Sequence, residues 1–105
     1  MRMTIPTQLV LRFLLQEPTA ERYGYEIGEA SGLPSGTVHP ILARLEGAGW
    51  LESRWEDVDT SGAGRPARRY YRLTADGVAA AREGLARAYQ SRKPALGTSP
   101  EPEAT

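Results

Sequence analysis

The chain contains no cysteine and only one histidine, His39, among its 105 residues. Without thiols it can form neither disulfides nor thiolate metal sites, and without a second imidazole it cannot build a histidine cluster for metal binding or catalysis. We therefore expect no enzyme active site, no bound metal and no cofactor.

Long hydrophobic runs are also absent. The longest apolar stretch, residues 9–15, is interrupted by Arg12 and is far shorter than the roughly 20 residues that a transmembrane helix needs. The first residues lack the apolar core and the cleavage site of a secretory signal. We expect one compact core, no membrane span and a cytoplasmic location.

The charges show no excess of either sign, with 13 basic and 13 acidic residues. Their placement is uneven, because Arg65, Arg68, Arg69 and Arg72 fall within eight positions. Arginine presents a planar fork that suits phosphate groups and guanine edges. A bias toward arginine can equally come from genome composition, so the clustering counts for more than the bias.

Apolar periodicity predicts three helices in the first half of the chain. The first covers residues 4–16 and is apolar on nearly every side, so we expect part of its surface to meet a second subunit. The second covers Tyr23 to Ala30, and the third runs from about Ser35 to Gly47. The short turn between the second and third helices predicts a helix-turn-helix.

The third helix has an outward face of small residues, Gly36, Pro40, Ala43 and Gly47, opposite its apolar stripe. Such a bare face suits a helix that lies in a groove, where long side chains would hold the backbone away. The alternative interpretation is an ordinary solvated face.

Alternating residues over 50–56 and 68–73 predict two antiparallel strands, joined by a long, mobile loop rich in Gly, Asp and Ser. The aromatic residues of these strands are expected to pack in the core and hairpin, Trp55 among them. The predicted fold is mainly α with a small β-hairpin, a winged helix-turn-helix over residues 1–73. Thr74 then caps a helix that runs to about Gln90 and is too long for the small core to cover, so we assign residues 74–92 to dimerisation. Residues 93–105 have the composition of a disordered tail.

The motifs resemble the PadR family of winged-helix transcriptional regulators. The resemblance covers residues 4 to about 90 and rests on Gly24-Tyr25-Glu26, on GTVHPILARLE at 36–46, and on Gly64-Arg65-Pro66 before RYYRLT at 69–74. The chain departs from the family at His39, where tyrosine is usual, and at Pro34-Ser35, where a serine or threonine commonly precedes proline. Its C-terminal part resembles the smaller, single-helix subfamily. The resemblance implies a homodimeric repressor that occupies a palindromic operator and is often released by a small-molecule effector.

A winged helix places its third helix in the major groove and its wing near the backbone or the minor groove. The DNA-binding residues expected on this basis are Ser35, Gly36, Thr37, His39, Pro40, Arg44, Gly64, Arg65, Pro66, Arg68 and Arg69. The expected dimerisation residues are Leu9, Phe13, Val78, Ala81, Leu85 and Tyr89.

Individual roles are expected for some of these residues. Ser35 either caps the third helix or contacts phosphate, Arg44 contacts phosphate, and Arg65 enters a narrow minor groove. Because strand residues alternate, Arg68 and Arg69 should point to opposite faces, with one on DNA and the other paired to an acid such as Glu52 or Glu56. A winged-helix module that binds proteins and not DNA is the alternative function.

Overall fold

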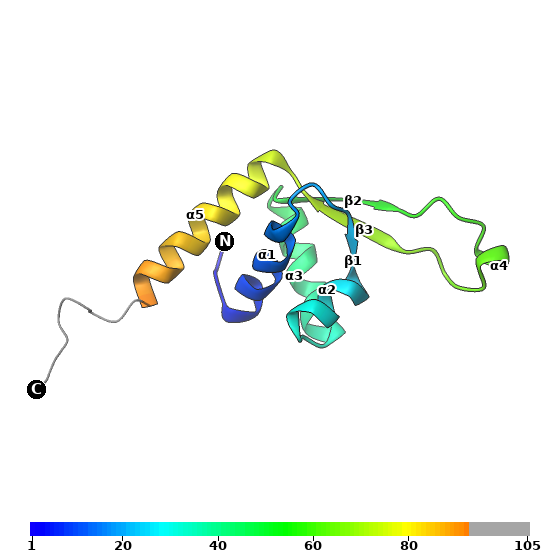
Figure 1. The fold of residues 1–105 in the computed structure, drawn as a ribbon, viewed down its shortest axis with the longest axis horizontal. Helices are drawn as coiled ribbons and strands as arrows, with labels where there is room; N and C mark the ends of the chain where they lie inside the picture. Colours follow the sequence, from blue (N-terminus) through cyan, green and yellow to red (C-terminus); the bar gives the residue numbers. More distant parts are fainter. Residues whose placement is uncertain (93–105) are drawn as a thin grey trace, which may run out of the picture.

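The computed structural model describes residues 1–92 of the chain. The elements in chain order are α1 (Ile5–Gln16), β1 (Arg22–Tyr23), α2 (Gly24–Ser31), α3 (Ser35–Gly47), β2 (Leu51–Trp55), α4 (Thr60–Ala63), β3 (Arg69–Leu73) and α5 (Ala75–Arg92). Helices α1, α2 and α3 form the body, the β2–β3 hairpin extends from one side of it, and α5 extends from the other side (Figure 1). The fold is mostly helical with a small antiparallel sheet, as the sequence predicts.

The core is formed where the apolar stripes of the three body helices meet. Leu11 of α1, Ile27 of α2 and Leu42 of α3 are each fully buried. Leu51 and Leu73, a cross-strand pair, close the core from the sheet side. Truncating a buried leucine or isoleucine to alanine typically costs about 2–5 kcal/mol, so these contacts fix how α3 is presented.

The turn between α2 and α3 holds the two helices in a helix-turn-helix. Gly32 is the C-cap residue of α2, and its φ of 74° lies in the left-handed region that glycine adopts without a steric penalty. Pro34, with an extended backbone, is the N-cap residue of α3. Ser35 is therefore the first helical residue and not the cap, which corrects the capping role considered for it.

The sheet has three strands in the order β1-β3-β2, all antiparallel. Residues 22 and 23 form the unexpected third strand, since Tyr23 pairs with Tyr70 before it leads into α2. The prediction was wrong in starting the second helix at Tyr23. A strand of two residues is too short to leave a periodic signal, and Tyr23 also fits the helical stripe that follows it.

The far end of the wing, which we take as the β2–β3 hairpin with its connection, contains the short helix α4 (Figure 1). The sequence predicts only an irregular loop here. The carboxylate of Asp59 accepts hydrogen bonds from the backbone N–H groups of Ser61 at 3.1 Å and Gly62 at 3.4 Å, and so closes a helical turn.

Helix α5 begins as expected, because Thr74 Oγ1 accepts a hydrogen bond from the N–H of Gly77 at 2.8 Å. The helix continues to Arg92, slightly beyond the predicted end near Gln90. Ala81 is completely buried within the protomer, so its side chain has no surface left for a second subunit and it drops out of the expected dimerisation set. The tail predicted for residues 93–105 lies outside the described part of the chain.

Candidate nucleic-acid interface

The outward face of α3 is open, as the residue spacing predicts. Gly36, Pro40, Ala43 and Gly47 are all exposed. A Cβ atom placed on Gly36 or Gly47 would meet no other atom within 4 Å, so within residues 1–92 nothing covers the face at these two positions. The buried residues of α3, among them Val38, lie on the opposite side of the helix.

Three polar residues flank this face. Arg44 is exposed and makes no ion pair with any residue in 1–92, which leaves its guanidinium available for a phosphate. His39 lies over Gly24 at the start of α2, where a Cβ atom would come within 2.9 Å of the imidazole Cε1. Thr37, half-buried, sits in the first turn of α3, and its N–H donates to the carbonyl of Pro34 at 2.9 Å. Because residue 24 is a glycine, the His39 imidazole can rest directly on the α2 backbone.

Arg65, near the tip of the wing, is held by an acid of the same hairpin. Its guanidinium donates two hydrogen bonds to the Glu56 carboxylate, at 2.7 and 3.0 Å, and a third to the carbonyl of Pro66 at 3.2 Å. Glu56 also accepts from the N–H of Arg68 at 3.1 Å. These hydrogen bonds, those from Arg65 above all, lower the pKa of Glu56 to about 2. Arg65, which was expected to enter a minor groove, is therefore already bound to Glu56. Gly64, with a φ of 69°, provides the turn that directs the chain back toward Glu56.

Arg68 and Arg69 contact different residues, although both line the groove described below. Arg68 stacks over the ring of Tyr23 at 4.2 Å from its centroid. Arg69 instead donates from Nε to Ser53 Oγ at 3.0 Å and lies 3.6 Å from the carboxylate of Glu46 in α3. The expected acidic partners were the wrong ones for Arg69, because helix α3 supplies the carboxylate.

The acids expected for that role have other partners across the sheet. The register places Glu52 opposite Arg72, with which it forms a 2.9 Å ion pair, while Glu56 holds Arg65. On the same outer face, Arg54 forms two 2.7 Å hydrogen bonds with Glu21. Most wing cations therefore have an acidic partner among the described residues, and the pair of Arg69 is the longest of these ion pairs.

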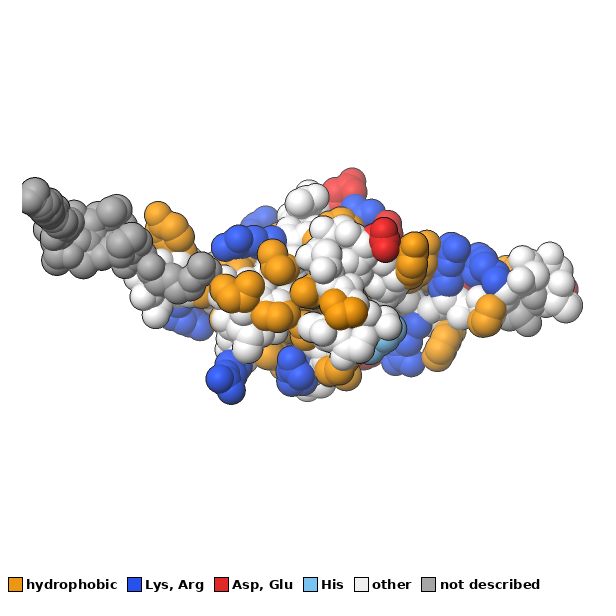
Figure 2. Space-filling model, turned by 90° about the horizontal axis from the view of Figure 1, so that it is seen from below, with side chains coloured by type: hydrophobic (Ala, Val, Ile, Leu, Met, Phe, Trp, Pro, Cys, Tyr) orange, Lys and Arg blue, Asp and Glu red, His pale blue; other side chains and the backbone are white. Residues whose placement is uncertain are grey.

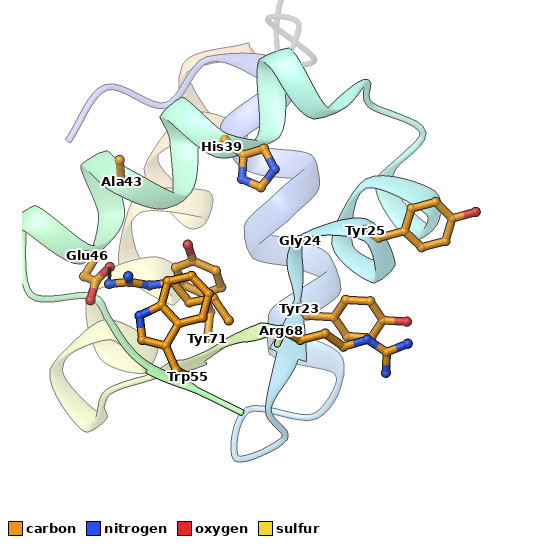
Figure 3. A pocket seen from close by; sticks show the side chains of 10 residues that line it. Tyr23, Gly24, Tyr25, His39, Ala43, Glu46, Trp55, Arg68 and Tyr71 are labelled. Carbon is orange, nitrogen blue, oxygen red and sulfur yellow. Dashed lines mark ion pairs between the residues drawn. The ribbon is translucent and has the colours of Figure 1, made fainter. Parts of the chain in front are cut away.

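A groove of about 500 Å³ lies between α3, the start of α2 and the base of the wing. It is lined by aromatic, cationic and small residues: Tyr23, Gly24, Tyr25, His39, Ala43, Glu46, Trp55, Arg68, Arg69 and Tyr71. Figure 3 shows Trp55, Tyr71 and Glu46 gathered at one end, with Tyr23 and Arg68 side by side at the other. The groove joins the open face of α3 to the wing.

Two exposed aromatic residues of this groove were not expected at the interface. Tyr25 at the start of α2 is 70% exposed, and Trp55 at the end of β2 is 61% exposed although we expected it to pack in the core and hairpin. Trp55 pairs with Arg69 at the end of the hairpin, so both side chains lie on one face of it, a relationship that the sequence alone does not reveal.

The charged groups are arranged unevenly over the surface. Figure 2 shows basic side chains along the wing and on the body, histidine where the wing leaves the body, and acidic side chains gathered near one edge of this view. A chain with no net charge therefore still presents a face on which cations predominate.

The model of the PadR-like family of transcriptional regulators matches residues 10–83. The chain belongs to this family. A PadR family transcriptional regulator from Eggerthella lenta is 30% identical, with a TM-score of 0.63, over 80% of this chain and 74% of its own. The family is one of transcriptional regulators, not enzymes. In a comparison with curated proteins, none matches the chain.

Two further solved structures resemble this PadR-like protein. A PadR family regulator from Clostridium difficile R20291 shares the fold with a TM-score of 0.66 at 23% identity, over 90% of this chain and 96% of its own. Reduced AbfR bound to DNA is 28% identical with a TM-score of 0.65, and the match covers 88% of this chain and 60% of AbfR, a protein of Staphylococcus epidermidis. The winged-helix fold of this PadR-like protein thus recurs in a structure that contains DNA.

Within residues 1–92, no helix combines the length and apolar character needed to cross a bilayer. Over the same residues, no three His, Cys, Asp or Glu side chains are placed to hold a metal ion.

Proposed function

We propose that this PadR-like protein is a sequence-specific DNA-binding repressor that acts as a homodimer on a palindromic operator. The observation that carries the proposal is the open face of α3, which carries the small residues Gly36, Pro40 and Ala43 and lies beside the wing. In winged-helix proteins the third helix enters the major groove, and a helix without long outward side chains can approach the base edges closely.

The remaining predicted contacts differ in whether the side chain already has an acidic partner within the described residues. Arg44 and Arg68 make no ion pair with the described residues and are the cations that we assign to phosphate. Arg65, with Gly64 and Pro66, shapes the wing tip in the unbound protein, and it reaches DNA only if Glu56 releases it. Ser35 and Thr37, at the N-terminus of α3, offer hydroxyl groups to phosphate.

The homodimer is supported by apolar side chains that the described part of the protomer covers only in part. Leu9 and Phe13 on α1 and Val78 and Leu85 on α5 are only half-buried, and Tyr89 is 59% exposed. Two α3 helices related by a two-fold axis would read half-sites about 10 base pairs apart or a multiple of that distance, which accounts for a palindromic operator.

Repression follows if the operator overlaps a promoter, and release by a small molecule is the simplest regulation for a dimer of this kind. A protein with this role works where the chromosome lies, in agreement with the expected cytoplasmic location. Because the net charge is zero, binding to random DNA should be weak and tight binding should require both half-sites.

Selection of bound sequences from random DNA, followed by titration of the selected site, tests the proposal. We expect a two-fold symmetric site. The variant Ala43→Glu should lose binding because a carboxylate on the α3 face meets the duplex, whereas Ala79→Glu, on an exposed position of α5, should bind normally. Enrichment of no sequence by a correctly folded protein would reject the proposal and leave a protein-binding winged helix as the alternative.

A further inference from the structure

One end of the groove between α3 and the wing brings two aromatic rings close to an arginine. Trp55 is largely exposed there, and its ring is contacted by the Arg69 guanidinium at 5.3 Å from the centroid. The centroid of the Tyr71 ring lies 6.0 Å from the same guanidinium. Large exposed aromatic surface is unfavourable in water unless a partner covers it, so this end of the groove has the character of an unfilled contact.

The Arg69 side chain is oriented before any partner arrives. Its Nε donates to Ser53 Oγ at 3.0 Å, and the Ser53 hydroxyl in turn donates to the Glu46 carboxylate at 2.5 Å. The bond to Nε restrains the guanidinium at 5.3 Å from the Trp55 centroid and 6.0 Å from the Tyr71 centroid. An arginine held in this way loses less conformational entropy when it binds a further group.

The terminal amino groups of Arg69 remain available. The 3.6 Å separation from Glu46 is longer than the charge-assisted hydrogen bonds of about 2.7–2.9 Å that would saturate them. With the residues of 1–92 they make no hydrogen bond, and the side chain is 40% exposed. Arg69 therefore presents unused donors toward the groove that it lines.

We propose that this groove holds one strand of the DNA backbone, with Arg69 donating to a phosphate and the Trp55 indole packed against the adjoining deoxyribose. The inference rests on the proposed DNA-binding function and names the part of the duplex that this site takes. When α3 lies in the major groove and the wing reaches toward the minor groove, the strand that separates the two grooves passes between them. That strand supplies both an anion for Arg69 and an apolar sugar edge for Trp55.

The first test compares two arginines of the same strand. Arg69→Gln should weaken binding to the selected site about ten-fold and reduce the salt dependence by about one phosphate contact. Arg72→Gln is the matched control, because Arg72 lies on the opposite face, paired to Glu52. It should leave both quantities unchanged. Equal effects of the two substitutions would overturn the assignment.

The second test locates the phosphate and follows Trp55 directly. Replacing phosphates one at a time by neutral methylphosphonate should identify one position at which the wild type loses about as much affinity as Arg69→Gln, while Arg69→Gln loses nothing further. In a Trp50→Phe chain, where Trp55 is the remaining tryptophan, addition of the site should change the emission and protect the indole from a soluble quencher.

The outcomes separate the two proposals. If the wild type binds a selected site but no phosphate is coupled to Arg69 and Trp55 stays accessible, the groove assignment is wrong and the DNA-binding function stands. If the folded wild type binds no DNA, both fail together.

Discussion

Gly77 of α5 lies directly against the backbone of Trp50, where a Cβ atom would come within 2.0 Å of the carbonyl oxygen. The same carbonyl accepts the N–H of Thr74 at 3.0 Å, so the end of the body and the start of α5 are joined by backbone contacts. This junction sets the direction in which α5 leaves the core.

The substitution Gly77→Ala should therefore destabilise the protein by about 3 kcal/mol, because rigid backbone atoms cannot move out of the way of the new methyl group. Urea denaturation measures the change. Gly84→Ala on the same helix is the control: its Cβ would meet only the flexible end of Met3, at 3.1 Å, and alanine favours the helix, so stability should change little. Similar losses of stability in both variants would show that the contact with Trp50 does not cause the effect of Gly77→Ala.

Titration of Glu56 tests the ion pair at the wing tip. The folded-state pKa is lowered from its ordinary 4.5 to about 2, so the stabilisation is present above pH 4.5 and is lost as the pH falls toward 2. The carboxyl carbon signal of Glu56, followed by NMR, should titrate near pH 2 in the wild type. Arg65→Gln should move that midpoint back toward the ordinary value. A wild-type midpoint near 4.5 would mean that the pair does not persist in solution.

Arg44 offers a separate test of how α3 meets DNA. Arg44→Gln should weaken binding by a similar factor for selected and random sequences and lower the salt slope by about one, as expected for a phosphate contact. Anisotropy titrations at several salt concentrations measure both effects. Arg82→Gln removes a charge from an exposed position of α5 and should alter neither. A loss confined to the selected sequence would instead assign Arg44 to a base.

The dimer proposal depends on apolar groups at the outer end of α5. Tyr89→Lys should raise the dimer dissociation constant at least ten-fold, since it places a charge where an aromatic ring would be buried. Sedimentation equilibrium measures this constant. The neighbouring exposed residue supplies the control, and Gln90→Lys should leave it unchanged. A wild type that is monomeric at high concentration would remove the basis for a palindromic operator.

The helices and the hairpin could be predicted because their residues carry local periodic signals. The stripe of Val38, Leu42 and Leu45 in α3 identifies its buried side, and the opposite side follows from geometry. Strand β1 could not be predicted, because two residues contain no period and pairing with β3 is decided by the tertiary fold.

The candidate site was predicted only in outline for a related reason. Sequence indicates which arginines cluster, but not which acid each one meets. Glu56 reaches Arg65 through the hairpin register, and Glu46 reaches Arg69 from a different element. Trp55 is exposed because the hairpin extends past the core at that residue, a distance that no local pattern encodes.

Strand β3 is bonded on both sides at Tyr70 and Tyr71, to β1 and to β2, whereas beyond Trp55 and Arg69 the two arms of the hairpin are joined only to each other, by the 2.7 Å bond from the Glu56 N–H to the Arg68 carbonyl and by the pair of Glu56 with Arg65. We therefore expect the root of the wing to be stiffer than its tip. The tip alone would then adjust its position to a minor groove whose width varies with sequence, while the root and α3 keep the distance between them.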